Sequence, residues 1–135
     1  MAAIDHLGIA VKSIASARGF YEALGLSIVH EEVVESEGVR TAMIPVGESR
    51  IELLEPTSAD SPVGRFLAKR GEGLHHVAIH VEDISGALEA LKAKGVRLIS
   101  EDLEIGAGGH LYFFIHPESA GGVLVEICQD SIADV

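Results

Sequence analysis

The chain of 135 residues has no tryptophan, and aromatic residues make up only 4% of it. So few rings argue against a base-stacking surface or a large aromatic anchor for a protein partner. The single cysteine, Cys128, excludes an intrachain disulfide and a multi-cysteine zinc module. Cys128 is instead typical of a small buried hydrophobic residue, and this cysteine usage predicts a protein of the reducing cytoplasm.

Basic residues are also scarce, because 10 Lys and Arg stand against 21 Asp and Glu, a formal net charge of −11. Without a Lys- or Arg-rich run, nucleic acid is not an expected partner. No apolar run reaches the roughly 18 residues of a membrane span, so no membrane partner is expected, and the N-terminus shows no targeting pattern. A hydrophobic content of 47% with 23% charged residues predicts one compact domain over residues 1–135.

The chain contains an internal repeat. Residues 6–25 align with residues 76–95 at an offset of 76 − 6 = 70, with seven identities in twenty positions. Roughly one identity is expected by chance at ordinary residue frequencies. A later segment, residues 51–53, aligns with residues 125–127 at an offset of 74, which requires a four-residue insertion. Two copies of one module are therefore predicted.

Each module predicts a strand, a helix and three further strands. The helices begin after the N-cap candidates Ser13 and Asp83 and end at Gly25 and Gly95. The remaining strands are predicted at 26–36, 39–46, 49–55, 97–101, 110–116 and 122–128. Module one spans about 4–56, a connecting segment with a short helix at about 62–70 spans 57–72, and module two spans about 73–128. We predict an α+β fold in which two tandem βαβββ modules pack as one domain, with a shared concave sheet face.

Four polar residues occupy repeated positions on these strands. His6 and His76 alternate with apolar residues that pack on the helices, so both face the open side of the sheet. Glu52 and Glu126 lie between apolar neighbours on the last strand of each module and share that open face. If a pseudo-two-fold axis relates the modules, the four side chains meet at the centre.

Two imidazoles and two carboxylates form a ligand set for a divalent cation, and the carboxylates neutralise its charge. Mixed nitrogen and oxygen ligands do not select sharply among Co²⁺, Mn²⁺, Ni²⁺ and Zn²⁺, so any of these four ions fits. Four protein ligands leave two octahedral positions open. The alternative is that each residue is structural, which is the commoner role of a single strand histidine or glutamate.

The chain resembles the vicinal-oxygen-chelate superfamily and, within it, the methylmalonyl-CoA epimerase family. The stretches that carry the resemblance are 51–56 (IELLEP), 60–67 (DSPVGRFL), 73–78 (GLHHVA), 105–109 (IGAGG), 116–117 (HP) and 121–126 (GGVLVE). The resemblance implies that His6, Glu52, His76 and Glu126 bind one divalent metal ion. It also implies an acyl-CoA substrate and a homodimer.

The implied reaction inverts C2 of methylmalonyl-CoA through a metal-stabilised enolate. Inversion requires acid/base groups on both faces of the carbon. Some family members carry a glutamate, proposed as a base, where this chain has Thr41. Glu52 and Glu126 are therefore the candidate catalytic pair, with a loop carboxylate, Glu35 or Glu37, as the alternative second base.

Other functions share parts of this pattern. A glyoxalase-like isomerase of a glutathione hemithioacetal would use the same four ligands. An extradiol-type dioxygenase would need only two histidines and one carboxylate, so the fourth ligand argues against it. A metal-free module that binds a small ligand would have no need of the symmetric set.

Overall fold

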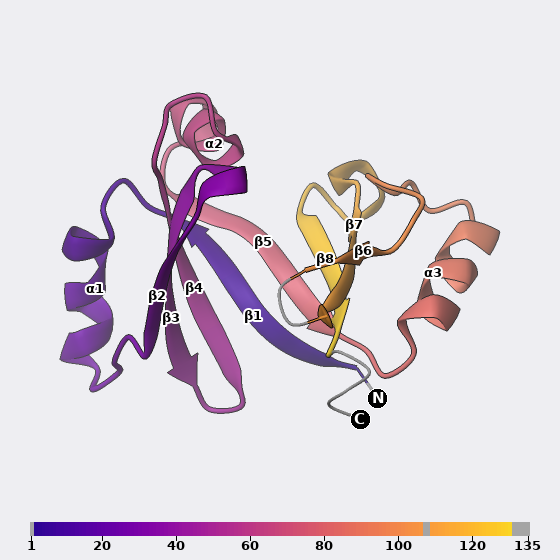
Figure 1. The fold of residues 1–135 in the computed structure, drawn as a ribbon, viewed down its shortest axis with the longest axis horizontal. Helices are drawn as coiled ribbons and strands as arrows, with labels where there is room; N and C mark the ends of the chain where they lie inside the picture. The colour runs from indigo at the N-terminus through magenta and orange to yellow at the C-terminus, as the bar shows by residue number, and fades with distance from the viewer. Residues whose placement is uncertain (1, 107–108, 131–135) are drawn as a thin grey trace. The chain divides into compact units, whose positions relative to one another are not determined.

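The computed structural model describes residues 2–106 and 109–130 and has the predicted α+β fold (Figure 1). The first βαβββ module consists of β1 (Ala3–Ala10), α1 (Ile14–Ala23), β2 (His30–Val34), β3 (Val39–Val46) and β4 (Ser49–Pro56). The second consists of β5 (Gly73–His80), α3 (Ile84–Ala93), β6 (Glu104–Ile105), β7 (Leu111–Ile115) and β8 (Leu124–Gln129). The helix α2 (Pro62–Arg70) connects them, as expected, and the 3₁₀ turns η1 (Glu35–Glu37) and η3 (Pro117–Ser119) complete the elements.

The eight strands follow the order β2-β3-β4-β1-β5-β8-β7-β6. The two modules therefore have the same connectivity, since β2-β3-β4-β1 corresponds to β6-β7-β8-β5. In each module the first strand is parallel to the last, and the other pairs are antiparallel. This repetition confirms the fold predicted from the offset alignment.

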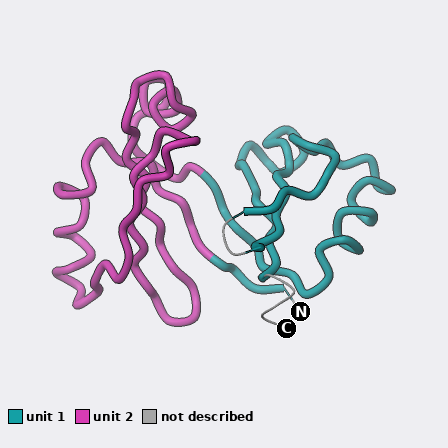
Figure 2. Tube along the Cα trace, viewed as in Figure 1, with its two compact units in different colours: residues 1–5, 76–135 teal, residues 6–75 magenta. Residues whose placement is uncertain are grey.

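The chain divides into two compact units (Figure 2). Unit 1 comprises residues 1–5 and 76–135, and unit 2 comprises residues 6–75. The boundaries fall within β1 and within β5, so each of these strands contributes residues to both units. Unit 2 contains α1 and α2 with two apolar clusters, and unit 1 contains α3 with a third.

In unit 2, helix α1 covers one face of its four strands. Ile14 of the helix packs in a buried cluster with Ala42, Ile44 and Leu53 from β3 and β4. A second cluster, on the opposite face, joins Val39 and other strand residues to Val63 of α2. Alternate side chains of each strand thus pack against α1. The side chains between them lie on the opposite face, with α2 and the polar residues.

In unit 1, helix α3 covers the equivalent face. Ile84 and Leu88 of the helix pack with Phe113, Ile115 and Ile127 of β7 and β8. Both His76 and Glu126 have the opposite strand parity to this cluster. The side chains on which the sequence prediction rests therefore lie away from the helix in unit 1, as they do in unit 2.

Both module helices begin at the predicted caps. Ser13 accepts a hydrogen bond from the Ser16 amide, and Asp83 accepts one from the Gly86 amide. Gly25 and Gly95 follow the helices with φ of 84° and 76°, the left-handed conformation that glycine adopts without strain.

Two predicted strands differ from the structure. The first run, 26–36, is strand only over β2 and then turns into η1. The run 97–101 contains no extended ladder but a single bridge between Leu98 and Ile115. The Arg97 amide donates to the Ser119 hydroxyl, and the Asp102 amide donates to the Ser100 hydroxyl. The Ile99 amide still donates to the Phe114 carbonyl, but the Arg97 amide, which would extend the pairing, goes to a side chain. The edge strand forms later, at β6.

No helix in the described ranges is long and apolar enough to cross a membrane. Residues 107–108, which belong to the glycine-rich stretch 105–109, lie outside the described residues.

Candidate metal centre

In unit 2, the predicted pair His6 and Glu52 lies on the strand face opposite α1. The Nε2 atom of His6 is 3.7 Å from Oε1 of Glu52. Gly8 stands directly opposite Glu52 in the β1–β4 ladder, so the ladder partner of Glu52 adds no side chain beside the carboxylate. His6 is only 7% exposed. Buried imidazole and carboxylate groups need polar partners, and a cation between them could be held by both.

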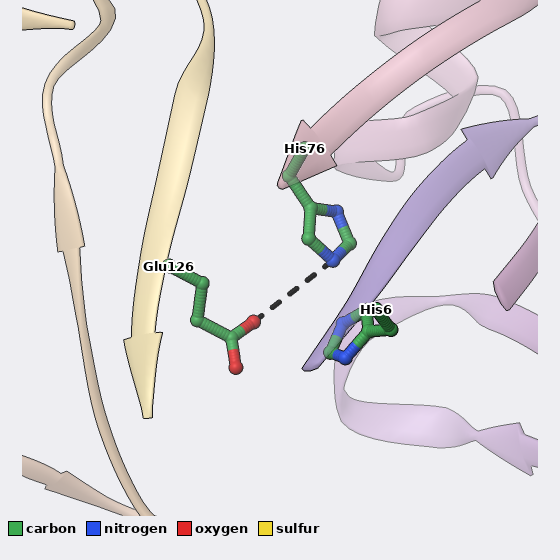
Figure 3. A group of neighbouring side chains, drawn as sticks. All are labelled: His6, His76 and Glu126. Carbon is green, nitrogen blue, oxygen red and sulfur yellow. Dashed lines mark ion pairs between the residues drawn. The ribbon is translucent and has the colours of Figure 1, made fainter. Parts of the chain in front are cut away.

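In unit 1, His76 and Glu126 repeat this arrangement. Nε2 of His76 is 3.9 Å from Oε1 of Glu126, and the dashed line in Figure 3 marks this pair. The small residue Ala78 stands opposite Glu126 in the β5–β8 ladder. Both members of the pair are buried, at 7% and 9% exposure. The two modules therefore each place one histidine and one glutamate, in matching register, on the same kind of sheet face.

Three of the four predicted ligands form one group. Ligand atoms of His6, the first residue of unit 2, and of His76 and Glu126 all lie within 4.8 Å of one another (Figure 3). Glu52 is not a member of this group, and its printed contact is with His6. Two imidazole nitrogens and a carboxylate oxygen suit a borderline divalent ion such as Co²⁺ or Zn²⁺. The donor set therefore fits the predicted metal.

Thr41 occupies a buried position on β3, with 7% exposure. It shares a strand face with Met43, whose ladder partner is Glu52. A side chain at position 41 thus lies on the same face as the Glu52 carboxylate. A hydroxyl cannot serve as a carboxylate base. With threonine rather than glutamate at position 41, this chain therefore has one candidate proton acceptor fewer on this face.

His110, which immediately precedes β7, was not among the site residues predicted from the sequence. Its Nε2 atom is 3.7 Å from Oε2 of Glu126, and its ring stacks on Tyr112 with 5.7 Å between centroids. The hydrogen bond to Glu126 raises the pKa of His110 above its usual value; burial opposes the rise, and the charges of Glu126, Asp5 and Asp130 add to it. His110 has no histidine partner in the repeat, so the offset alignment could not reveal it.

His75, the neighbour of the predicted ligand His76, has a different environment. Its ring packs edge-on against Phe66 of α2, with centroids 5.0 Å apart. Burial lowers the pKa of His75, because the protonated form loses hydration. His75 lies outside the group of ligand atoms that contains His76, and its contacts are those of a residue that packs against α2.

The chain is similar to known proteins over most of its length. The family model of the glyoxalase/bleomycin resistance protein/dioxygenase superfamily matches residues 5–114. The mitochondrial methylmalonyl-CoA epimerase of Bos taurus is 39% identical over 128 residues, which are 93% of this chain and 73% of that protein.

Two solved structures are also similar to the chain. The methylmalonyl-CoA epimerase of Mycobacterium tuberculosis has a TM-score of 0.86 and 36% identity, covering 98% of this chain and 91% of that one. A methylmalonyl-CoA epimerase in complex with methylmalonyl-CoA and NH₄⁺ has a TM-score of 0.85 and 39% identity, covering 96% and 94%. These findings confirm the resemblance seen in the sequence motifs. The chain belongs to the glyoxalase/bleomycin resistance protein/dioxygenase superfamily and, within it, to the family of the methylmalonyl-CoA epimerases.

Proposed function

We propose that this protein is a metal-dependent epimerase that inverts C2 of methylmalonyl-CoA. The observation that carries the proposal is the repeated pair of a buried histidine and a buried or half-buried glutamate, 3.7 Å apart in unit 2 and 3.9 Å apart in unit 1. Relatives of 36–39% identity that are named for this reaction support the choice of substrate. An acyl-CoA is accordingly the expected small-molecule partner.

The proposed metal ligands are His6, Glu52, His76 and Glu126. One bound divalent ion, Co²⁺, Mn²⁺, Ni²⁺ or Zn²⁺, would supply positive charge beside the thioester oxygen and so stabilise the negative charge that develops when C2 loses its proton. Both histidines are buried, each with 7% exposure. A dry, preorganised set of donors strengthens this electrostatic effect.

The proposed acid/base pair is Glu52 and Glu126. One carboxylate takes the proton of C2, which leaves the electron pair in an enolate, and the other carboxyl group returns a proton to the opposite face. The proposal requires that the two glutamates reach C2 from opposite sides, as the repeat symmetry predicts. Thr41 cannot replace either one, because a hydroxyl is too weak a base at neutral pH. Glu35 and Glu37 of η1 are the alternative second bases.

The experiment follows conversion of one epimer of methylmalonyl-CoA by chiral analysis, with protein that is metal-loaded, chelator-treated and reloaded. We expect conversion that a chelator abolishes and added metal restores. The exposed pair His30 and Glu32, 3.6 Å apart, offers a matched control of the same residue types. The variants His30→Ala and Glu32→Gln should retain metal and activity. Conversion that is indifferent to chelator would contradict the metal-dependent mechanism.

A further inference from the structure

We infer that His110 is a positioning residue that holds the Glu126 carboxylate in the orientation its proposed role requires. The inference rests on the proposed function, because it assigns a task within the same metal centre. It concerns residues of unit 1 only. No histidine of the internal repeat corresponds to His110, so the role is additional to the four predicted ligands.

The two oxygens of Glu126 have different neighbours. Oε1 is 3.9 Å from Nε2 of His76, and Oε2 is 3.7 Å from Nε2 of His110. A carboxylate approached by imidazoles at both oxygens is restrained from rotating about its terminal bond. Histidine partners that hydrogen-bond a ligating carboxylate orient it and tune its basicity. His110 would thus keep Oε1 turned toward His76 and the cation.

The His110 ring is itself held in place. It stacks on Tyr112 at an interplanar angle of 24°, and Tyr112 contacts Phe114 edge-on, with centroids 5.8 Å apart. Phe114 is the ladder partner of Glu126 across β7 and β8. The backbone carbonyl of His110 accepts a hydrogen bond of 2.7 Å from the Gly106 amide. The aromatic stack and the ladder therefore place the imidazole relative to the carboxylate.

In unit 2 the position equivalent to His110 is not a histidine. Met43 is opposite Glu52 just as Phe114 is opposite Glu126, so Val39 is the counterpart of His110, four residues earlier in each case. Val39 is 3% exposed and packs in the cluster that contains Val63 of α2. A valine has no hydrogen-bond donor for a carboxylate. The two glutamates are therefore supported differently: Glu126 has His110 at this position, whereas Glu52 has an apolar residue.

A competing arrangement uses the same atoms. Ligand atoms of His110, Glu126 and Cys128 also lie within 4.8 Å of one another. If a cation bound there, His110 would be a ligand rather than a positioning residue, and sulfur would join the coordination sphere. The sulfur of Cys128 lies 3.6 Å from the carbonyl oxygen of Ile79, to which the thiol donates a hydrogen bond, and this bond favours the positioning role.

The experiment measures Co²⁺ affinity, by competition with a chromophoric chelator, for wild type, His110→Ala and His110→Gln. We expect His110→Ala to weaken Co²⁺ binding about 10–100-fold, as loss of such partners does elsewhere. His110→Gln keeps an N–H donor and should recover much of that loss. His80→Gln is the control, because His80 also faces a carboxylate, Asp130 at 3.5 Å, and should leave Co²⁺ affinity unchanged.

Three results would overturn the inference. One is a Co²⁺ affinity of His110→Ala within twofold of wild type. Another is an equal loss in His110→Ala and His110→Gln. The third is a thiolate-to-cobalt charge-transfer band in wild type that Cys128→Ser abolishes, which would place the ion at the competing group. Failure of the proposed function would be seen separately, in wild type that binds no ion or converts no substrate.

Discussion

The two units share one topology but differ in the residues that surround the His–Glu pair on the strand face opposite the module helix. In unit 2, the end of the face beyond Glu52 is apolar: Ala10, Val39 and Leu54 are buried with Val63 of α2. In unit 1, the register places His80, His110 and Cys128 at the corresponding positions. A helix that covers a face demands apolar residues, whereas a polar residue at such a position can serve the site, as we infer for His110. The repeat thus conserves the His–Glu pairs while the surroundings of each pair diverge.

The helix N-termini show the same divergence on a smaller scale. The Ile14 amide, at the start of α1, donates to Oε1 of Glu55, and the Ile84 amide, at the start of α3, donates to Oε1 of Gln129. Both bonds are 2.7 Å long, and 129 − 55 = 74, the offset of the last strands. Each module therefore ties its helix to its last strand, with a charged acceptor in unit 2 and a neutral one in unit 1.

The strongest challenge to equivalence of the two units is to neutralise each glutamate in turn. Glu52→Gln and Glu126→Gln should each lower kcat for epimerisation about 10²–10⁴-fold, because each removes one acid/base group. Kinetics with each epimer as substrate would check this. Full activity in Glu52→Gln would refute the two-glutamate mechanism and indicate a base elsewhere, with Glu35 and Glu37 as the next candidates.

A second comparison removes equivalent core residues. Leu53 and Ile127 are related by the offset of 74 and are 0% and 6% exposed. Leu53→Ala and Ile127→Ala should each destabilise the protein by about 2–5 kcal/mol, through lost burial and a residual cavity. Urea unfolding with both variants measures the effect. A loss below 1 kcal/mol in either variant would show that its α-helix is not anchored by that cluster.

The smallest expected effects come from the hydrogen bonds that Glu55 and Gln129 accept from the first amides of α1 and α3. Glu55→Ala and Gln129→Ala should each cost about 0.5–2 kcal/mol, since each leaves a helix N-terminal amide without its acceptor. Glu55→Gln makes unit 2 resemble unit 1 and should cost only about 0.3–1 kcal/mol, the interaction of the charge with the helix dipole. Thermal unfolding of the three variants would rank them. A larger loss for Glu55→Gln than for Glu55→Ala would contradict this assignment.

Local signals made much of this structure predictable. Ser13 and Asp83 predicted both helix starts, and the alternation around His6 and His76 predicted which side chains face away from the helices. The repeat then related positions that are far apart in sequence. These features depend on neighbours within one turn or one strand, which a sequence displays directly.

Other features depended on contacts that no local pattern encodes. The segment 97–101 was predicted as a strand, but the Ser119 hydroxyl takes the amide of Arg97 from a distant part of the chain. His110 acquires its role from the β7–β8 register, which brings it to Glu126. The Glu55 and Gln129 ties could have been found by extending the offset of 74 by two residues. The sequence alone offers no comparable signal for His110.

The most direct test of the account is solvent deuterium incorporation at C2. Metal-loaded protein is incubated with one epimer of methylmalonyl-CoA in D₂O, and the product is analysed by mass and by chirality. The account predicts deuterium at C2 together with conversion to the other epimer, both abolished by a chelator. Bound metal without any exchange at C2 would contradict it, and the glutathione hemithioacetal would become the next substrate to test.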